Sequence, residues 1–265
     1  MIPYMRAVAG AAKRSANVQR DGSATQSAAS SFQRGGGRVV ALVARRAGRA
    51  VCGEGRSLRA ARRAGTLRTM TQVHGVILAA GRSTRMSEPK PLLEVGGETF
   101  LRRSARTLRQ AGCERVHVVV NADAEWAEDA VRGLDAEVLH NPDPDSEQVD
   151  SLRIVLRTLP DDVGGVLVLP VDLPLVAAET ARAVVAAFRA APGPLFLPFH
   201  NGVAGHPVLL GRELFTEVLD SPLDEGIRSL IMEHSADLRE VAVTDPGILI
   251  DIDTPDDYWR YIQQK

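Results

Sequence analysis

The chain has 265 residues, 45% of them hydrophobic and 25% charged, a composition typical of one large or two small globular domains. No apolar run reaches the roughly 18 to 20 residues of a membrane-spanning helix, so the sequence favours a soluble protein. The net charge of −1 hides a division at Met70: 13 Arg and one Lys against two acidic residues give residues 1–70 a charge of +12, and the remainder carries −13.

Residues 1–70 are rich in Ala, Arg, Gly and Ser and poor in large apolar side chains. They bury too little surface to offset the entropy of folding, so we expect a disordered basic extension. A transit peptide or a nucleic-acid-binding arm shares this charge. The simplest interpretation is a start-site extension, because Met70 stands directly before the first expected strand. The acidic remainder argues against a nucleic-acid partner, and two isolated cysteines indicate no disulfide framework, which fits a cytoplasmic location.

From residue 71 onward, short apolar runs alternate with longer amphipathic segments, and Gly and Pro mark the joints. Strands are expected at 73–80, 115–121, 136–141 and 164–172, and helices at 99–112, 124–134, 150–159 and 177–191. Alternation of this kind predicts an α/β domain over residues 71–265, with a mostly parallel sheet and helices on both faces.

The later part of the chain has shorter elements. Strands are expected at 194–199, 206–211, 239–243 and 247–253, with short helices at 212–219 and 226–233. They predict a small mixed extension of the same sheet. A last helix begins with Thr254 as N-cap and Pro255 at its first position.

The loop after the first expected strand, "AAGRSTRMSEPK" at residues 79–90, has the character of a phosphate site. In an open α/β sheet the ligand crevice lies beyond the carboxyl ends of the strands. Small residues let the backbone N–H groups approach an anion, and Arg82, Arg85 and Lys90 supply positive charge. Neither standard nucleotide fingerprint is present. An ordinary turn with exposed cations would explain the same residues.

The segment at residues 78–93, read as L-A-A-G-x-S-x-R-M-x-x-x-K-x-L-L, resembles the signature of the MobA-like nucleotidyltransferase superfamily. It is most similar to the molybdenum cofactor cytidylyltransferase branch. The resemblance continues over nearly all of residues 74–264 through "DSLR", "PVDLP", "GHPVLL", "DEGIR" and "DIDTPDDY", in the family's order.

The resemblance implies a Rossmann-like nucleotidyltransferase fold, a nucleoside triphosphate substrate and Mg²⁺ as cofactor. It also implies that a phosphate on the acceptor attacks the α-phosphorus and releases pyrophosphate, a reaction that needs positioning and charge neutralisation more than a protein nucleophile. The catalytic residues implied are Arg82, Lys90 and Asp172. The nucleotide-binding residues implied are Leu78, Ala79, Ala80, Gly81, Arg82, Lys90 and Ser151. The metal ligands implied are Asp172 and Asp253, and the acceptor-binding residues are His206, Asp224 and Arg228.

Several of these residues also have a plain structural interpretation. Asp172 follows an apolar strand and should reach the crevice mouth, where its carboxylate suits Mg²⁺, but it could equally cap a turn. Asp251 and Asp253 alternate on an expected strand and should point the same way, or both could hold a turn. A lone histidine such as His206 is often structural. For the "D-x-G-x-R" pattern at residues 224–228, a helix cap with an internal salt bridge is the alternative.

Two departures from the family pattern concern base and acceptor recognition. The chain reads "SEQVDSLR" at residues 146–153, where the family has a Gly-Met pair, and Ser87 stands where a glycine commonly follows "RM". Lost glycines narrow the backbone angles available. The resemblance implies CTP rather than GTP, because cytidylyl members of the family tend to carry L-A-A-G, as here with Ala80, and guanylyl members L-A-G-G. A methyl group pointing into the base pocket would exclude the larger purine.

The sequence therefore predicts a Mg²⁺-dependent cytidylyltransferase acting on a molybdopterin-type cofactor, with a molybdoenzyme as a possible recipient of the product and with no membrane partner. One alternative within the enzyme class is transfer from GTP, or to another phosphorylated acceptor such as a sugar phosphate. An alternative of another class is a non-catalytic carrier of molybdenum cofactor, which would bind the acceptor tightly but would have no need of a metal clamp.

Overall fold

The computed structural model describes residues 71–263 apart from 82, 84 and 87. The basic extension expected at residues 1–70 lies outside the described residues. Within the described part, no helix is long and apolar enough to cross a membrane.

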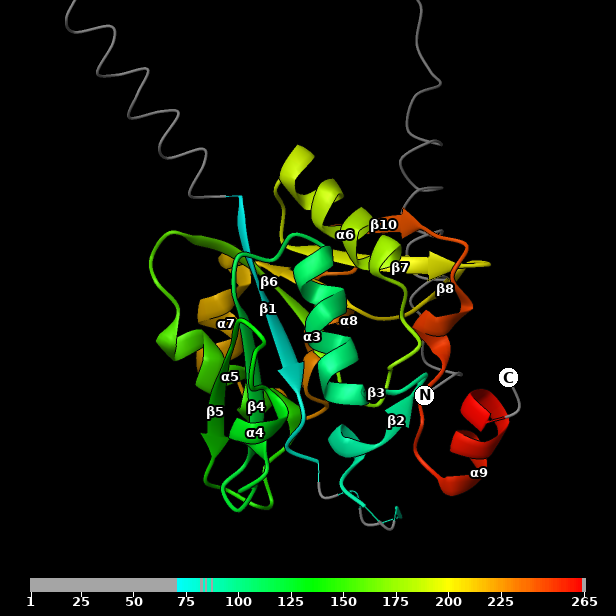
Figure 1. Cartoon of the computed structure of the whole chain (residues 1–265). Helices are drawn as coiled ribbons and strands as arrows, with labels where there is room; N and C mark the ends of the chain where they lie inside the picture. The colour runs from blue at the N-terminus through cyan, green and yellow to red at the C-terminus, as the bar shows by residue number, and fades with distance from the viewer. Residues whose placement is uncertain (1–70, 82, 84, 87, 264–265) are drawn as a thin grey trace, which may run out of the picture.

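The core of the domain is an eight-stranded sheet in the order β10-β7-β9-β6-β1-β4-β5, with β8 paired to β7 (Figure 1). A separate two-stranded hairpin joins β2 to β3. The strands are β1 Gln72–Leu78, β2 Glu94–Val95, β3 Glu98–Thr99, β4 Val116–Asn121, β5 Ala136–Asn141, β6 Val163–Pro170, β7 Leu195–His200, β8 Val203–Ala204, β9 Val208–Gly211 and β10 Leu238–Ala242.

The sheet is parallel except around β9 and β8. β1 pairs in parallel with both β4 and β6, β4 with β5, and β10 with β7, whereas β9 runs antiparallel to β6 and β7. The short β8 returns antiparallel to β7. This arrangement confirms the expected α/β fold with a small mixed extension.

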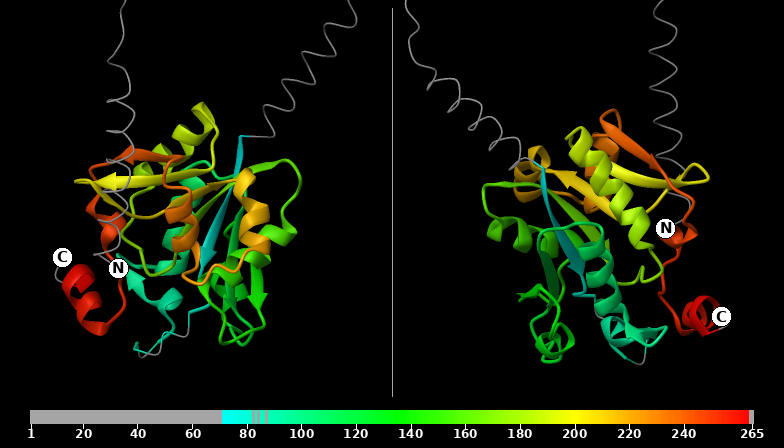
Figure 2. Two further views of the ribbon diagram at one scale, coloured as in Figure 1. Left: turned by 180° about the vertical axis from the view of Figure 1, so that it is seen from behind. Right: turned by 45° about the horizontal axis from the view of Figure 1, so that its top comes forward.

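Helices cover both faces of the sheet, as expected. The α-helices are α3 Phe100–Gln110, α4 Ala127–Ala130, α5 Gln148–Thr158, α6 Ala178–Ala190, α7 Phe215–Asp220, α8 Ile227–Glu233 and α9 Pro255–Tyr258. The remaining helical turns are η1 Lys90–Leu92, η2 Arg212–Leu214, η3 Pro246–Leu249 and η4 Trp259–Gln263. α3 and α6 lie on the face toward the viewer in Figure 1, and α5, α7 and α8 cover the opposite face, which the left view of Figure 2 shows.

Alternation along β1 divides the core into two clusters. Val73 and Ile77 pack with α3 and α6, whereas Val76 and Leu78 pack with α5, α7 and α8. Successive strand residues point to opposite faces, so a strand covered on both faces reads as a continuous apolar run, as β1 and β6 do.

Local signals set the helix boundaries. The Thr99 hydroxyl accepts a hydrogen bond from the Arg102 N–H and so caps α3, and Gly112, at φ +94°, supplies the left-handed turn that ends it. A capping box between Glu147 and Asp150 begins α5 at Gln148. The helix therefore starts two residues before the expected position, residue 150.

Two expected elements differ in the structure. The helix expected at 124–134 is reduced to α4, four residues long between turns, and Gly133 at φ +77° ends the segment. The strand expected at 247–253 is instead η3 followed by an unpaired loop. Pro246 and the Asp245 side chain, which accepts from the Gly247 N–H, favour a helical turn there. Asp251 and Asp253 therefore lie on a loop rather than on a strand.

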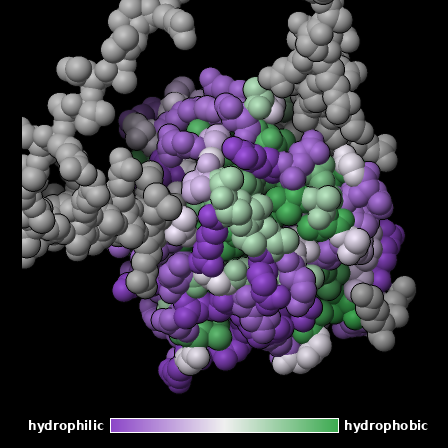
Figure 3. All heavy atoms as spheres, turned by 90° about the horizontal axis from the view of Figure 1, so that it is seen from above, coloured by the Kyte–Doolittle hydropathy of each residue, from purple (hydrophilic) through white to green (hydrophobic). Residues whose placement is uncertain are grey.

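The carboxyl ends of β1 and β5 point to the lower end of the molecule in Figure 1, near the β2–β3 hairpin, whereas β7 and β10 point to the right. The Tyr258 hydroxyl donates to the Glu94 carbonyl at 2.8 Å and so ties α9 to this hairpin. Figure 3 shows the opposite end, where the visible surface is largely hydrophilic with smaller hydrophobic areas between. The expected ligand crevice is therefore at the lower end.

Candidate active site

A small cavity of about 110 Å³ opens where β1 and β6 end. Its lining includes residues 78–81 of the first loop, Lys90, Ser151 and Asp172. These are the nucleotide-binding residues that the sequence predicted, together with the first predicted metal ligand, so the fold brings them into one place. The exception is Arg82, which lies outside the described residues.

The first loop is held in shape by Ser83. This residue has a φ of +47°, in the left-handed region that few non-glycine residues adopt. Its hydroxyl accepts a hydrogen bond from the backbone N–H of Lys90 at 3.0 Å. The bond fixes where Lys90 leaves the loop, and η1 begins at that residue.

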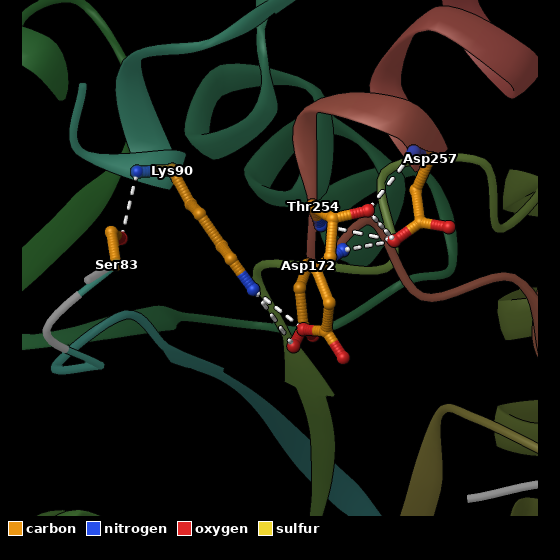
Figure 4. A network of polar contacts seen from close by, with 6 residues as sticks. Ser83, Lys90, Asp172, Thr254 and Asp257 are labelled. Carbon is orange, nitrogen blue, oxygen red and sulfur yellow. Dashed lines mark hydrogen bonds and ion pairs between the residues drawn. The ribbon is translucent and has the colours of Figure 1, made fainter. Parts of the chain in front are cut away.

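The Lys90 side chain connects the two predicted metal ligands. Its ammonium group donates to Asp253 Oδ1 at 2.6 Å and lies 3.9 Å from Asp172 Oδ2. Figure 4 shows the Lys90 side chain extending from the start of η1, where its backbone bonds to Ser83, to the Asp172 carboxylate. Lys90 and Asp253, 163 positions apart in sequence, thus meet beside Asp172.

Asp253 is held by the start of α9. The Asp257 carboxylate accepts from the backbone N–H groups of Asp253 and Thr254, at 3.3 and 2.9 Å, and from the Thr254 hydroxyl at 2.7 Å. Thr254 caps α9 as predicted, with Pro255 following. The Ile252 N–H donates to the Asp172 carbonyl at 2.8 Å, which joins the two acidic segments through the backbone.

The carboxylates in this site share a crowded, partly desolvated environment. Burial raises the pKa of Asp172; the Lys90 ammonium partly opposes this shift, and the Asp253 charge adds to it. The pKa of Asp251 rises to about 7, because its carboxyl is buried and because the charges of Asp172 and Asp253 are close. A cation is thus the favoured neighbour for these groups.

The pair fits a hard divalent cation in its donor chemistry. Asp172 Oδ1 is buried without a hydrogen-bond partner, and a buried carboxylate oxygen of this kind is costly unless a cation or a donor satisfies it. The described residues contain no group of three or more His, Cys, Asp or Glu side chains that could hold a metal ion, so the protein ligands available here are the two carboxylates. Two carboxylates suit Mg²⁺, which usually keeps several waters and binds substrate phosphates as well.

A second, larger cavity of about 520 Å³ adjoins the first. Its lining includes the predicted acceptor residues His206 and Arg228, together with apolar side chains such as Val149, Val208 and Ile231. His206 Nδ1 is buried and has no hydrogen-bond partner among the described residues. Burial also lowers the pKa of His206 to about 4, so the imidazole is neutral near pH 7.

The third predicted acceptor residue, Asp224, lies differently. It is exposed, and the cavity is lined instead by its neighbours Glu225 and Gly226. Gly226 adopts a φ of +62° before α8, and this turn redirects the chain. Glu225 pairs with Arg228 at 3.2 Å, which is the internal salt bridge considered from the sequence, made by the adjacent carboxylate.

The two cavities share Leu78 and residues 146–148. Sequence reasoning singled out none of residues 146–148 as contacts, nor the buried Asn141, whose amide donates to the hydroxyls of Ser146 and Ser151 at 2.8 and 3.0 Å. Ser151 is therefore buried and positioned from β5. The position of "SEQ" just before a helix start could have shown that these residues face the crevice.

Comparisons with known proteins agree with this geometry. The family model described as MobA-like NTP transferase domain matches residues 75–238. The molybdenum cofactor cytidylyltransferase of Escherichia coli (strain K12) is 25% identical over 190 residues, which are 71% of this chain and 95% of that protein.

Solved structures with a similar fold were also found. The crystal structure of Rv0371c from Mycobacterium tuberculosis H37Rv matches with a TM-score of 0.62 and 30% identity, covering 72% of this chain and 98% of that one. Its complex with manganese matches with a TM-score of 0.60 and 28% identity, covering 73% and 100%. With the family model covering more than half of the sequence and the signature loop, Lys90 and Asp172 gathered in one cavity, this chain belongs to the MobA-like NTP transferase family.

Proposed function

We propose that the protein transfers a CMP group from CTP to the phosphate of a molybdopterin-type cofactor and releases pyrophosphate, with Mg²⁺ bound by Asp172 and Asp253. Membership in a nucleotidyltransferase family gives the class of reaction. The observation that carries the proposal is the pair of adjoining cavities. The first joins the signature loop to Lys90 and Asp172, and the second is larger and more apolar and contains His206 and Arg228.

The nucleotide occupies the small cavity and the space that it opens onto. The backbone N–H groups of Ala80 and Gly81 can face the triphosphate there, since the Ala79 N–H donates to the Val119 carbonyl, and the Lys90 ammonium supplies a positive charge. A pterin ring system suits the larger cavity, whose apolar side chains can pack against its faces while a few polar groups fix its orientation. The lining residues that the two cavities share support binding of the acceptor beside the nucleotide.

In the reaction, an oxygen of the acceptor phosphate forms a bond to the α-phosphorus of CTP. The bond from that phosphorus to the β-phosphate breaks, and pyrophosphate leaves with the electron pair. The phosphate nucleophile is largely ionised at neutral pH, so the site does not need a base to activate it. The protein holds the two phosphates in line, and Lys90 stabilises the charge on the leaving pyrophosphate.

Mg²⁺, when bound, neutralises charge on the triphosphate and polarises its phosphoryl oxygens. Asp172 and Asp253 would hold it, because they converge and because one Asp172 oxygen is unpartnered. Support also comes from the manganese complex of the M. tuberculosis relative. The choice of CTP rests on Ala80, which lines the small cavity, and on the name of the E. coli relative.

The test is to incubate the purified protein with Mg²⁺, molybdopterin cofactor and each of the four nucleoside triphosphates, and to measure pyrophosphate. We expect release with CTP that depends on the acceptor. Release with GTP alone, or with a sugar phosphate in place of the cofactor, would reassign the substrates. Asp172→Ala separates an enzyme from a carrier: an enzyme loses turnover, whereas a carrier keeps tight acceptor binding and shows no turnover in either form.

A further inference from the structure

One ammonium group occupies the place between the two carboxylates. The Lys90 nitrogen is 2.6 Å from Asp253 Oδ1 and 3.9 Å from Asp172 Oδ2, and the Lys90 and Asp172 side chains are only 15% and 17% exposed. Figure 4 shows the Lys90 ammonium beside the Asp172 carboxylate, with Thr254 and Asp257 of α9 close by. The charge that compensates this acidic pair is therefore supplied from within the chain.

Backbone hydrogen bonds anchor the two acidic segments and the Lys90 backbone, whereas the contacts of the lysine ammonium are with the two carboxylates. Asp257 holds the backbone at Asp253, and the Ile252 N–H bonds to the Asp172 carbonyl. At the other side, the Lys90 N–H is fixed to the Ser83 hydroxyl of the signature loop. Between these points lies a flexible four-carbon stem, so a change of side-chain rotamer can move the ammonium while both anchors stay in place.

A divalent cation between Asp172 and Asp253 would compete with this ammonium. Both would use the same two carboxylates, and a dication this close to an ammonium is strongly repelled by it in a partly buried site. Because the described residues offer no third His, Cys, Asp or Glu ligand to the pair, the protein has little extra affinity with which to displace the lysine.

We propose that Lys90 is an internal counter-ion that occupies the metal position until the triphosphate arrives. The nucleotide phosphates then attract the ammonium away from the carboxylates, and the metal enters in its place. This proposal rests on the proposed function, since it requires a phosphate substrate in the small cavity. Its consequence is that the protein without nucleotide binds the divalent cation weakly, and that metal and nucleotide bind with positive cooperativity.

The test measures Mn²⁺ binding by electron paramagnetic resonance of the free ion, without nucleotide, on the full chain. Lys90→Met should bind Mn²⁺ at least about 10-fold more tightly than the unmodified protein, since tenfold corresponds to a modest electrostatic gain. Arg157→Met is the matched control, because it removes one positive charge from an exposed helical position and should leave the affinity unchanged. Adding Asp253→Asn to Lys90→Met should abolish the gain.

Equal or weaker Mn²⁺ affinity in Lys90→Met would overturn the proposal, and so would the absence of binding in both proteins. An equal gain in Arg157→Met would also overturn it, because net charge alone would then explain the effect. Lys90→Gln provides a second variant if thermal unfolding shows that Lys90→Met is not folded. Pyrophosphate release by the unmodified protein is assayed separately, so the proposed function can fail while the counter-ion role stands, and the reverse.

Discussion

The two cavities lie side by side but differ in how their buried polar groups are accommodated: one has a charged partner and the other has none among the described residues. In the small cavity, burial raises the pKa of Asp172, and Lys90 compensates the charge. In the large cavity, burial lowers the pKa of His206 to about 4, and its buried Nδ1 has no partner among the described residues. The first cavity therefore holds compensated charges, whereas the second is larger and more apolar, and the proposed division between catalysis and acceptor recognition rests on this difference.

The largest effect should follow from breaking the small cavity. Asp172→Asn keeps the size of the side chain but removes its charge, so it should lower kcat by about 100-fold or more, the scale of losing one electrostatic contact to the reacting phosphates. The KM for the acceptor should change little, because the large cavity is intact. Steady-state pyrophosphate release measures both parameters.

Asp237→Asn is the matched control for this change, because Asp237 is exposed on a turn after α8. It should leave kcat unchanged. If the kcat of Asp172→Asn stays within threefold of that of the unmodified protein, Asp172 is not a catalytic residue. The proposal that the small cavity is the catalytic one would then be wrong.

The next effect concerns η3, which packs against the chain segments next to Asp172 and His206. A Cβ at Gly247 would overlap the carbonyl oxygen of Leu175, three residues after Asp172, and a Cβ at Gly205, beside His206, would overlap the carbonyl oxygen of Ile248. Gly247→Ala should therefore lower the free energy of unfolding by about 2 to 3 kcal/mol, the cost of forced overpacking. Urea unfolding measures this difference.

Gly81→Ala gives the contrast, because a Cβ at Gly81 would meet no atom within 4 Å. We expect a stability change below about 0.5 kcal/mol, as at open surface sites, together with a higher KM for the nucleotide. If Gly81→Ala destabilised the fold as much as Gly247→Ala, the glycine in the signature loop would be a structural requirement rather than a ligand contact.

The sequence was most informative where chemistry and periodicity agree. A continuous apolar run followed by small residues predicted β1 and its loop, and an apolar run ending in "PVD" predicted the position of Asp172. Both predictions were possible because a buried parallel strand has a continuous apolar sequence and because ligands bind beyond its carboxyl end. Thr254 and Pro255 marked the start of α9 in the same way. The prediction that Asp172 and Asp253 converge depended on the family resemblance, since nothing local relates positions so distant in sequence.

The errors arose where one pattern has two physical solutions. Alternating Ile and Asp in "GILIDID" suits an edge strand, but Pro246 and the Asp245 cap favour a helical turn, and the loop that follows is held by contacts with Asp172 that no local pattern reveals. The shift from Asp224 to Glu225 has a similar cause, because it depends on the positive φ of Gly226. The roles predicted for His206 and Arg228 remain predictions.

A pH experiment sharpens the comparison at the large cavity. The pKa of His206 falls from 6.5 to about 4 on folding, so the unfolded chain binds a proton more readily than the folded one. Stability from this group is fully present above about pH 6.5 and is lost as the pH falls toward 4. Between pH 7.5 and 5, the unmodified protein should lose about 2 kcal/mol more stability than His206→Gln.

Urea unfolding at the two pH values measures this difference. His140→Gln, at an exposed position on β5, should behave as the unmodified protein does. If the unmodified protein and His206→Gln lose equal amounts of stability, the imidazole is solvated in the folded state. The large cavity would then accommodate a charged side chain, as the small one does.

The smallest expected effect concerns Arg228 on the rim of the large cavity. Its guanidinium is about half exposed and pairs with Glu225, so it is a weaker contact than the groups inside. Arg228→Met should raise the KM for the acceptor about 10-fold, the value of one charge-assisted contact to a phosphate. The KM for CTP should stay constant, and Arg157→Met should change neither. A parallel rise in the KM for CTP would place Arg228 on the nucleotide and would mean that one substrate spans both cavities.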